Sequence, residues 1–253
     1  MTVTTFDFGD GNGPVAAHQH PNGDGWVAET ARVGATVYVG KNALVYGKAK
    51  VDGNAKVYGN ARVFCNAMAC DDAQIYGNAQ IYGNAMIYGN ARIGGDARIC
   101  DNAKVDGNAR IWGNARIGGN AQAYDEVYVG GSAQIFGDAQ VYGKAYIGGD
   151  ALVNGDARIR DNAYVGGSAQ IFGDAQLYGS AQVKRGKYDA SPITIVRSDG
   201  HSFTMQSDGS IVAGCRDFTP DGADAHWGNP EHIRHAESMA ILTALRAIHA
   251  ARQ

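Results

Sequence analysis

The chain has 253 residues, a formal net charge of -3 and 45% hydrophobic residues. This charge balance gives no general attraction to nucleic acid or to an anionic membrane surface, so neither is expected as a partner. No run approaches the roughly 20 apolar residues that cross a bilayer, and the start MTVTTFDFGD lacks a signal-peptide pattern. The four cysteines form no CxxC pair, so we expect reduced thiols and a cytoplasmic protein.

Residues 1–26 precede any repeat and contain the segment AAHQHPNGDGW. His18 and His20 are alternate residues, so in an extended segment they would share a side and could bind a metal or act as a base. The other interpretation is a polar arm that folds over the base of the region that follows. We expect an N-terminal capping arm, with His18 and His20 as the candidate catalytic residues.

Residues 27–184 form an uninterrupted six-residue repeat, and 27 repeats fit between Val27 and Val183. Each has a small residue, nearly always alanine, two positions before an aliphatic one, so the two share one side of a short strand. Glycine followed by Asn, Asp or Ser then supplies a corner. A single repeat buries too little to be stable, so the repeats must stack as a solenoid.

The run GNAQIYGNAMIYGNARIGGDARI resembles the hexapeptide repeat of the left-handed parallel β-helix, the fold of the bacterial acyltransferase superfamily. The segment HQHPNGDGWVAETARV is similar to the start of bacterial and phage hexapeptide-repeat proteins. The resemblance implies an all-β solenoid in which three repeats close one triangular coil, and therefore about nine coils. It also implies a homotrimer with substrate clefts between neighbouring prisms.

Histidine is missing from the whole repeat region. Acyltransferases of the family commonly use a prism histidine as general base, and carbonic anhydrases of the same fold use three to hold a metal. Neither role can be transferred to a position between Val27 and Val183. The usual catalytic mechanism of the family is therefore not expected.

The outward positions of the repeat carry aromatic residues. If every third repeat shares a face, Tyr128, Tyr146 and Tyr164 lie above one another, and further ladders are expected elsewhere (Tyr46, Phe64 and Tyr82; Tyr58 and Tyr76). Such ladders form an apolar stripe larger than a monomer normally exposes. A trimer interface is the preferred interpretation, ahead of a ligand-binding face.

Arginines should also meet on adjacent coils, with Arg92 beside Arg110 and Arg98 beside Arg116. Like charges opposite each other across strands are unfavourable unless something neutralises them. One interpretation is an anion site in the subunit cleft, for a phosphate of coenzyme A or of a nucleotide, framed by Arg92, Arg110 and Trp112. The other is neutralisation by interleaved carboxylates, namely Asp96, Asp101 and Asp106.

Residues 185–253 form a different region, expected to be an α+β cap or oligomerisation domain. Two Asp-Gly turns, at 199–200 and 208–209, predict a three-stranded antiparallel meander over 193–215. Asn229 followed by Pro230 predicts a helix start, and the helix should run to about Ala251. Its expected apolar face consists of Ile233, Ile241, Leu245 and Ile248.

The tail holds His226, His232 and His235, and the last two would share a helical face. Two imidazoles without a third positioned ligand are insufficient for zinc, so ordinary surface or packing histidines are expected and no metal site. Cys215 could be a nucleophile only beside a histidine. Otherwise it is a small buried side chain.

Two functions follow. The favoured one is a non-catalytic homotrimeric scaffold, in a phage or prophage setting, that binds a small nucleotide-like anion or a partner protein. Its ligand-binding residues would be Arg92, Arg110, Trp112, Tyr128, Tyr146 and Tyr164. The alternative is an acyltransferase-like enzyme that uses acyl-coenzyme A or an activated sugar in the inter-subunit cleft. The uninterrupted prism favours the first.

Overall fold

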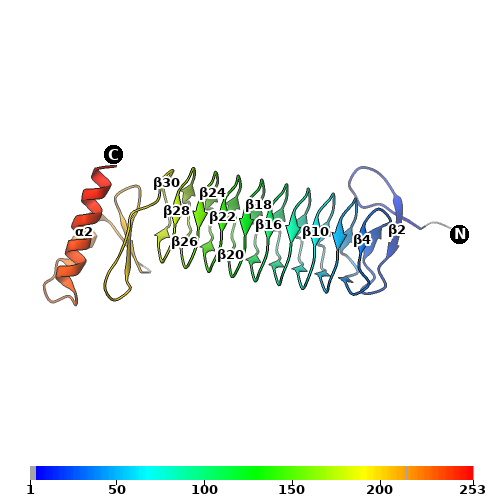
Figure 1. Ribbon diagram of the computed structural model, residues 1–253, viewed down its shortest axis with the longest axis horizontal. Helices are drawn as coiled ribbons and strands as arrows, with labels where there is room; N and C mark the ends of the chain where they lie inside the picture. Colours follow the sequence, from blue (N-terminus) through cyan, green and yellow to red (C-terminus); the bar gives the residue numbers. More distant parts are fainter. Residues whose placement is uncertain (1–3, 215, 253) are drawn as a thin grey trace.

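The computed structural model describes residues 4–214 and 216–252. The molecule is a long prism with an N-terminal arm at one end and a helix-bearing cap at the other (Figure 1). Cys215 lies outside the described residues, so the roles considered for it stay predictions.

Three parallel sheets form the sides of the prism. The prism strands of the first sheet are β3 (Trp26–Ala28), β6 (Leu44–Val45), β9 (Arg62–Val63), β12 (Gln80–Ile81), β15 (Arg98–Ile99), β18 (Arg116–Ile117), β21 (Gln134–Ile135), β24 (Leu152–Val153), β27 (Gln170–Ile171) and β30 (Lys187–Tyr188). The second consists of β4 (Arg32–Val33), β7 (Lys50–Val51), β10 (Met68–Ala69), β13 (Met86–Ile87), β16 (Lys104–Val105), β19 (Gln122–Ala123), β22 (Gln140–Val141), β25 (Arg158–Ile159) and β28 (Gln176–Leu177). The third consists of β5 (Tyr38–Val39), β8 (Lys56–Val57), β11 (Gln74–Ile75), β14 (Arg92–Ile93), β17 (Arg110–Ile111), β20 (Tyr128–Val129), β23 (Tyr146–Ile147), β26 (Tyr164–Val165) and β29 (Gln182–Val183).

The repeat builds the prism as its residue pattern predicts. The alanines and aliphatics point inward, so that Ala115 and Ile117, for example, are fully buried in one continuous core. Two of the three sheets have nine strands, which gives about nine coils of three repeats. The predicted fold class is confirmed: a parallel β-helix followed by a small antiparallel sheet and helices.

The corners of the prism are held by polar contacts between coils. Most corner residues are glycines with positive φ, such as Gly113 at 70°, where an added Cβ would lie 2.7 Å from the Gly131 carbonyl oxygen. Asp101 occupies one such position with φ 57°, and its carboxylate accepts a hydrogen bond from the Gly119 N–H at 2.9 Å. Carboxylates at the corners therefore accept hydrogen bonds from the backbone of the next coil.

The N-terminal arm covers one end of the first sheet. Strand β1 (Thr5–Phe6) pairs antiparallel with β2 (Val15–Gln19), which pairs antiparallel with β3. Phe6 stacks on Trp26 at 4.5 Å, and Phe8 stacks on Tyr46 at 4.9 Å. The arm thus pairs with an edge that would otherwise expose unpaired backbone groups.

The prism continues past the last regular repeat. Strand β30 pairs with β27 so that Tyr188 lies beside Ile171, and the Tyr188 side chain joins the prism core. Its position is one residue short of the repeat spacing, so the six-residue period does not show it. The predicted domain boundaries at 26/27 and 184/185 stay predictions.

The cap contains more elements than the sequence predicts. Its sheet consists of β31 (Thr194–Val196), β32 (Ser202–Met205), β33 (Ile211–Ala213) and a fourth strand, β34 (Arg216–Phe218). Helix α1 (Pro220–Trp227) follows directly, with the Thr219 hydroxyl capping its first turn. Thr219 before Pro220 is an N-cap signal that the sequence analysis did not use.

The predicted start of the last helix is wrong. Helix α2 (His235–Ala250) begins after Arg234, because Arg234 has a left-handed backbone with φ 62°; Asn229 instead accepts a hydrogen bond from the Glu231 N–H in a local turn before it. Ile241 and Leu245 pack in the cap core against the sheet, whereas Ile233 is 82% exposed and Ile248 is also exposed. The meander is thus the partner surface for this helix. No helix in the described ranges is long and apolar enough to cross a membrane.

The cap is joined to the prism by side chains that bind the backbone of β29. Thr204 accepts a hydrogen bond from the Gln182 N–H at 3.1 Å. The fully buried Gln206 accepts one from the Lys184 N–H at 3.1 Å and donates one to the Gln182 carbonyl at 2.9 Å. These side chains take the place of the next strand of the third sheet.

We predict that Gln206→Leu destabilises the cap by about 1–3 kcal/mol, because backbone groups of Gln182 and Lys184 lose their partners. Urea unfolding followed by fluorescence of the buried Trp227 measures the change. The control is Gln134→Leu on an exposed position of β21, where the expected change is within about 0.5 kcal/mol. Equal changes in the two variants would contradict the role of Gln206.

Candidate functional site

The third sheet presents a column of outward side chains, each one residue before the buried aliphatic of its strand. From β8 to β29 the column contains Lys56, Gln74, Arg92, Arg110, Tyr128, Tyr146, Tyr164 and Gln182. Cations thus occupy the middle of the prism, and aromatic rings lie toward the cap.

The tyrosine part of this column is a stacked ladder. Ring centroids are 5.0 Å apart between Tyr128 and Tyr146 and again between Tyr146 and Tyr164. A Cβ added at Gly148 would lie 2.5 Å from the Tyr146 ring, so the glycine lets the ring lean across it. The predicted stacking is confirmed. Trp112, 47% exposed, meets the Tyr128 ring edge-on at 5.6 Å.

The two arginines are neighbours, as predicted: Arg92 pairs in register with Arg110, and Arg110 with Tyr128. No carboxylate of the described chain forms an ion pair with either arginine. The interleaved aspartates serve the corners instead: Asp96 accepts from Asn78, Asp101 from Gly119 and Asp106 from Gly107. The neutralisation interpretation is therefore not supported at this face.

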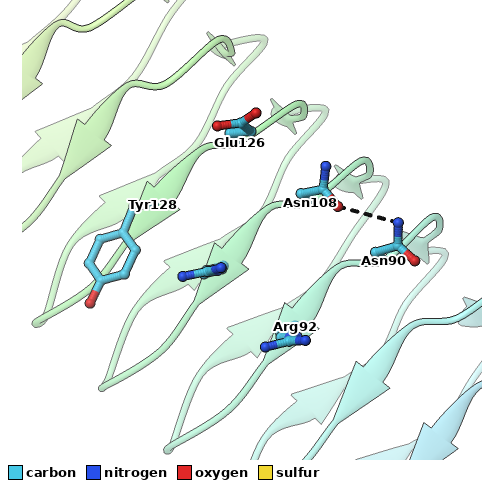
Figure 2. A pocket seen from close by; sticks show the side chains of 6 residues that line it. Asn90, Arg92, Asn108, Glu126 and Tyr128 are labelled. Carbon is cyan, nitrogen blue, oxygen red and sulfur yellow. Dashed lines mark hydrogen bonds between the residues drawn. The ribbon is translucent and has the colours of Figure 1, made fainter.

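A hollow of about 330 Å³ lies beside these arginines, and we call it the prism hollow. It is lined by the predicted Arg92, Arg110 and Tyr128 and by three residues that the sequence analysis missed: Asn90, Asn108 and Glu126. Figure 2 shows Asn90 and Asn108 on neighbouring coils, joined by a hydrogen bond of 3.3 Å. Each of the three lies two positions before a lining Arg or Tyr. The alternation of side chains along an extended segment could therefore have predicted that they share its outward side. Trp112, Tyr146 and Tyr164 lie outside the lining.

The electrostatics of the prism hollow favour an anion. Its one carboxylate, Glu126, has a partner in Lys144 at 3.7 Å. Burial raises the pKa of the Tyr128 phenol, so its hydroxyl remains a hydrogen-bond donor at neutral pH. Two guanidinium groups, a phenol and two amides can thus surround a phosphate or carboxylate.

The histidines of the arm have different partners. His18 Nδ1 lies 2.6 Å from a carboxylate oxygen of Glu29 on the exposed surface. His20 is buried and contacts the backbone of Asn22. The side chains of His18 and His20 therefore do not come together in one candidate catalytic site.

The tail histidines are only partly brought together. The rings of His226 and His232 are 5.1 Å apart, whereas His235 Nδ1 lies 2.6 Å from the Trp227 carbonyl oxygen. Within the described ranges, no group of three or more His, Cys, Asp or Glu side chains is arranged to hold a metal ion.

Comparison with known proteins gives limited matches. Residues 79–95 match the family model described as the YdcK beta solenoid repeat. Among solved structures, the UDP-N-acetylglucosamine acyltransferase from Campylobacter jejuni is similar, with 20% identity, a TM-score of 0.35, and coverage of 61% of this chain and 68% of that chain. That likeness carries no argument about what this chain binds. No curated protein matches the sequence.

We predict that Arg92→Gln stabilises the free protein by about 0.2–1 kcal/mol at low salt, because it removes a like charge beside Arg110. Added salt should reduce the gain by screening. Urea unfolding at two salt concentrations measures it. Arg158→Gln is the matched control, since Arg158 lies between Gln140 and Gln176 and should gain nothing. The same gain in both variants would show that the arginine stack is not strained.

Proposed function

We propose that this chain is a non-catalytic, homotrimeric β-helix scaffold of the cytoplasm that binds a small anionic, nucleotide-like ligand in the prism hollow. The observation that carries the proposal is the pair Arg92 and Arg110, which stack on adjacent coils without an ion-pair partner in the described chain and line the same hollow as Tyr128. Strands of adjacent coils are about 4.8 Å apart, a spacing at which one phosphate can bridge two guanidinium groups. The bound anion supplies the negative charge that the two arginines lack in the described chain.

The aromatic ladder supports the trimer. Tyr128, Tyr146 and Tyr164 form an apolar stripe that continues directly from the prism hollow toward the cap. A neighbouring prism packed against this stripe would cover it and would form a further wall of the prism hollow. The ligand would then lie between two subunits, with Tyr128 as the residue common to the interface and the site.

We predict that ATP and coenzyme A bind the wild-type protein in isothermal titration at low ionic strength. The double variant Arg92→Gln, Arg110→Gln should weaken binding at least about tenfold, because it removes two charge-assisted contacts. The matched control is Arg98→Gln, Arg116→Gln, which removes the other like-charged pair, on the first sheet.

Three results would overturn the proposal. Equal weakening by both double variants would mean diffuse electrostatic attraction rather than a site. Turnover of an acyl donor that disappears in His18→Ala or His20→Ala would contradict a non-catalytic function. Retention of full affinity in the Arg92, Arg110 variant would place the ligand elsewhere.

We predict that sedimentation equilibrium gives a mass of three 26.6-kDa chains, and that Tyr146→Glu lowers it by placing a charge in the apolar stripe. Tyr142→Glu, in the Tyr124–Tyr142 ladder of the second sheet, is the control and should remain trimeric. A wild-type mass of one chain would contradict the trimer, and dissociation of the control alone would contradict the chosen face.

A further inference from the structure

A second cavity lies in the cap, beside β34 and α1, and has a volume of about 290 Å³; we call it the cap pocket. Its apolar wall comes from Ala213, Phe218 and Trp227. The Phe218 and Trp227 rings are 4.4 Å apart, and Trp227 is buried in the cap core. The pocket therefore offers a rigid aromatic surface that can contact a flat apolar group.

A guanidinium group without a counter-ion lines the same pocket. Arg216 is exposed on β34 and has no ion-pair partner in the described chain. The next residue, Asp217, points to the other side of the strand and pairs with Lys184 at 3.4 Å and Arg185 at 3.0 Å. Strand alternation thus leaves the positive group at the pocket and sends the carboxylate away from it.

Two imidazoles face this guanidinium. His226, on α1, stacks on Phe218 at 5.0 Å and lies 5.1 Å from the His232 ring. His232 Nδ1 contacts the Ile233 carbonyl oxygen at 2.7 Å, which leaves Nε2 for the pocket. Burial, together with the charges of His232 and Arg216, lowers the pKa of His226. The positive charge of Arg216 therefore acts on the His226 side chain inside the pocket.

The remaining charged groups around the pocket do not cancel this charge. His201, the residue before β32, also lines it. Arg197 also lines it, but its guanidinium is held by Asp199 at 2.9 and 2.7 Å. No carboxylate is among the described lining residues, and Asp224 of α1 pairs with Arg246 at 2.9 Å.

We propose that the cap pocket binds a small organic anion: its carboxylate, sulfonate or phosphate group contacts Arg216, His226 and His232, and its flat apolar body lies on Phe218 and Trp227. A divalent cation fits less well, because Arg216 repels it and the described residues supply no third ligand. Since the His226 imidazole gains charge as pH falls, the anion binds more tightly in acid. This site is independent of the prism hollow.

Benzenesulfonate and methanesulfonate test the proposal, because both keep one negative charge throughout the pH range and differ in the aromatic ring. Titration calorimetry on the full chain compares about pH 5 with about pH 8; the lower pH lies well below the ordinary histidine pKa of about 6.5 because the His226 pKa is lowered. Benzenesulfonate should bind at least about tenfold more tightly at the lower pH and at least about tenfold more tightly than methanesulfonate. In NMR, saturating benzenesulfonate should raise the pKa of His226.

Arg216→Gln, a surface substitution, should weaken benzenesulfonate binding at least about tenfold and remove the NMR effect on His226. The double variant Arg92→Gln, Arg110→Gln is the control and should bind benzenesulfonate like wild type. Conversely, Arg216→Gln should bind ATP like wild type, so the failure of one site is distinguishable from failure of the other. Equal affinity for the two sulfonates, no pH dependence, or unchanged binding in Arg216→Gln would each overturn the proposal.

Discussion

The structure depends on the backbone hydrogen bonds that join each coil to the next. The Arg92 N–H donates to the Ala109 carbonyl at 2.9 Å, and the Arg110 N–H to the Val127 carbonyl at 2.8 Å, and the same pattern continues along the prism. These bonds tolerate no slip, since a shift of one residue would turn the buried aliphatics outward. A fixed six-residue repeat is the simplest sequence that satisfies them.

This register also determines the surface. Outward residues form columns in which each side chain has fixed neighbours on the coils before and after it, so aromatic rings meet rings and cations meet cations. The tyrosine column gains from stacking, whereas the arginine column stores repulsion. The corner aspartates do not form ion pairs with Arg92 or Arg110 in the described chain; Asp101 and Asp96 accept hydrogen bonds from glycine and asparagine groups. The repulsion between Arg92 and Arg110 therefore remains on the third sheet, beside the prism hollow.

Periodicity explains which parts could be predicted. The neighbours Arg92 and Arg110 and the ladder of Tyr128, Tyr146 and Tyr164 follow from position in the repeat alone. Asn90 and Asn108 were predicted only as corner residues and Glu126 was not singled out, because their shared role emerges when side chains close a hollow in three dimensions. In the cap no register applies, so β34 and α1 were missed and α2 began later than expected. The cap pocket joins residues of β33, β34 and α1 with residues of two connecting segments, and has no linear signature.

The junction between Gln206 and strand β29 has a consequence for the evolution of such chains. The cap binds backbone N–H and carbonyl groups at β29, and the arm pairs with β3 and stacks Phe6 and Phe8 on Trp26 and Tyr46, so each junction involves only the coils at its own end of the prism. Every coil offers the same backbone pattern. The number of coils can therefore change without disturbing either end. Duplication or loss of a whole coil between the two ends leaves both junctions intact. It changes only the distance between the ends and the number of side chains in each surface column.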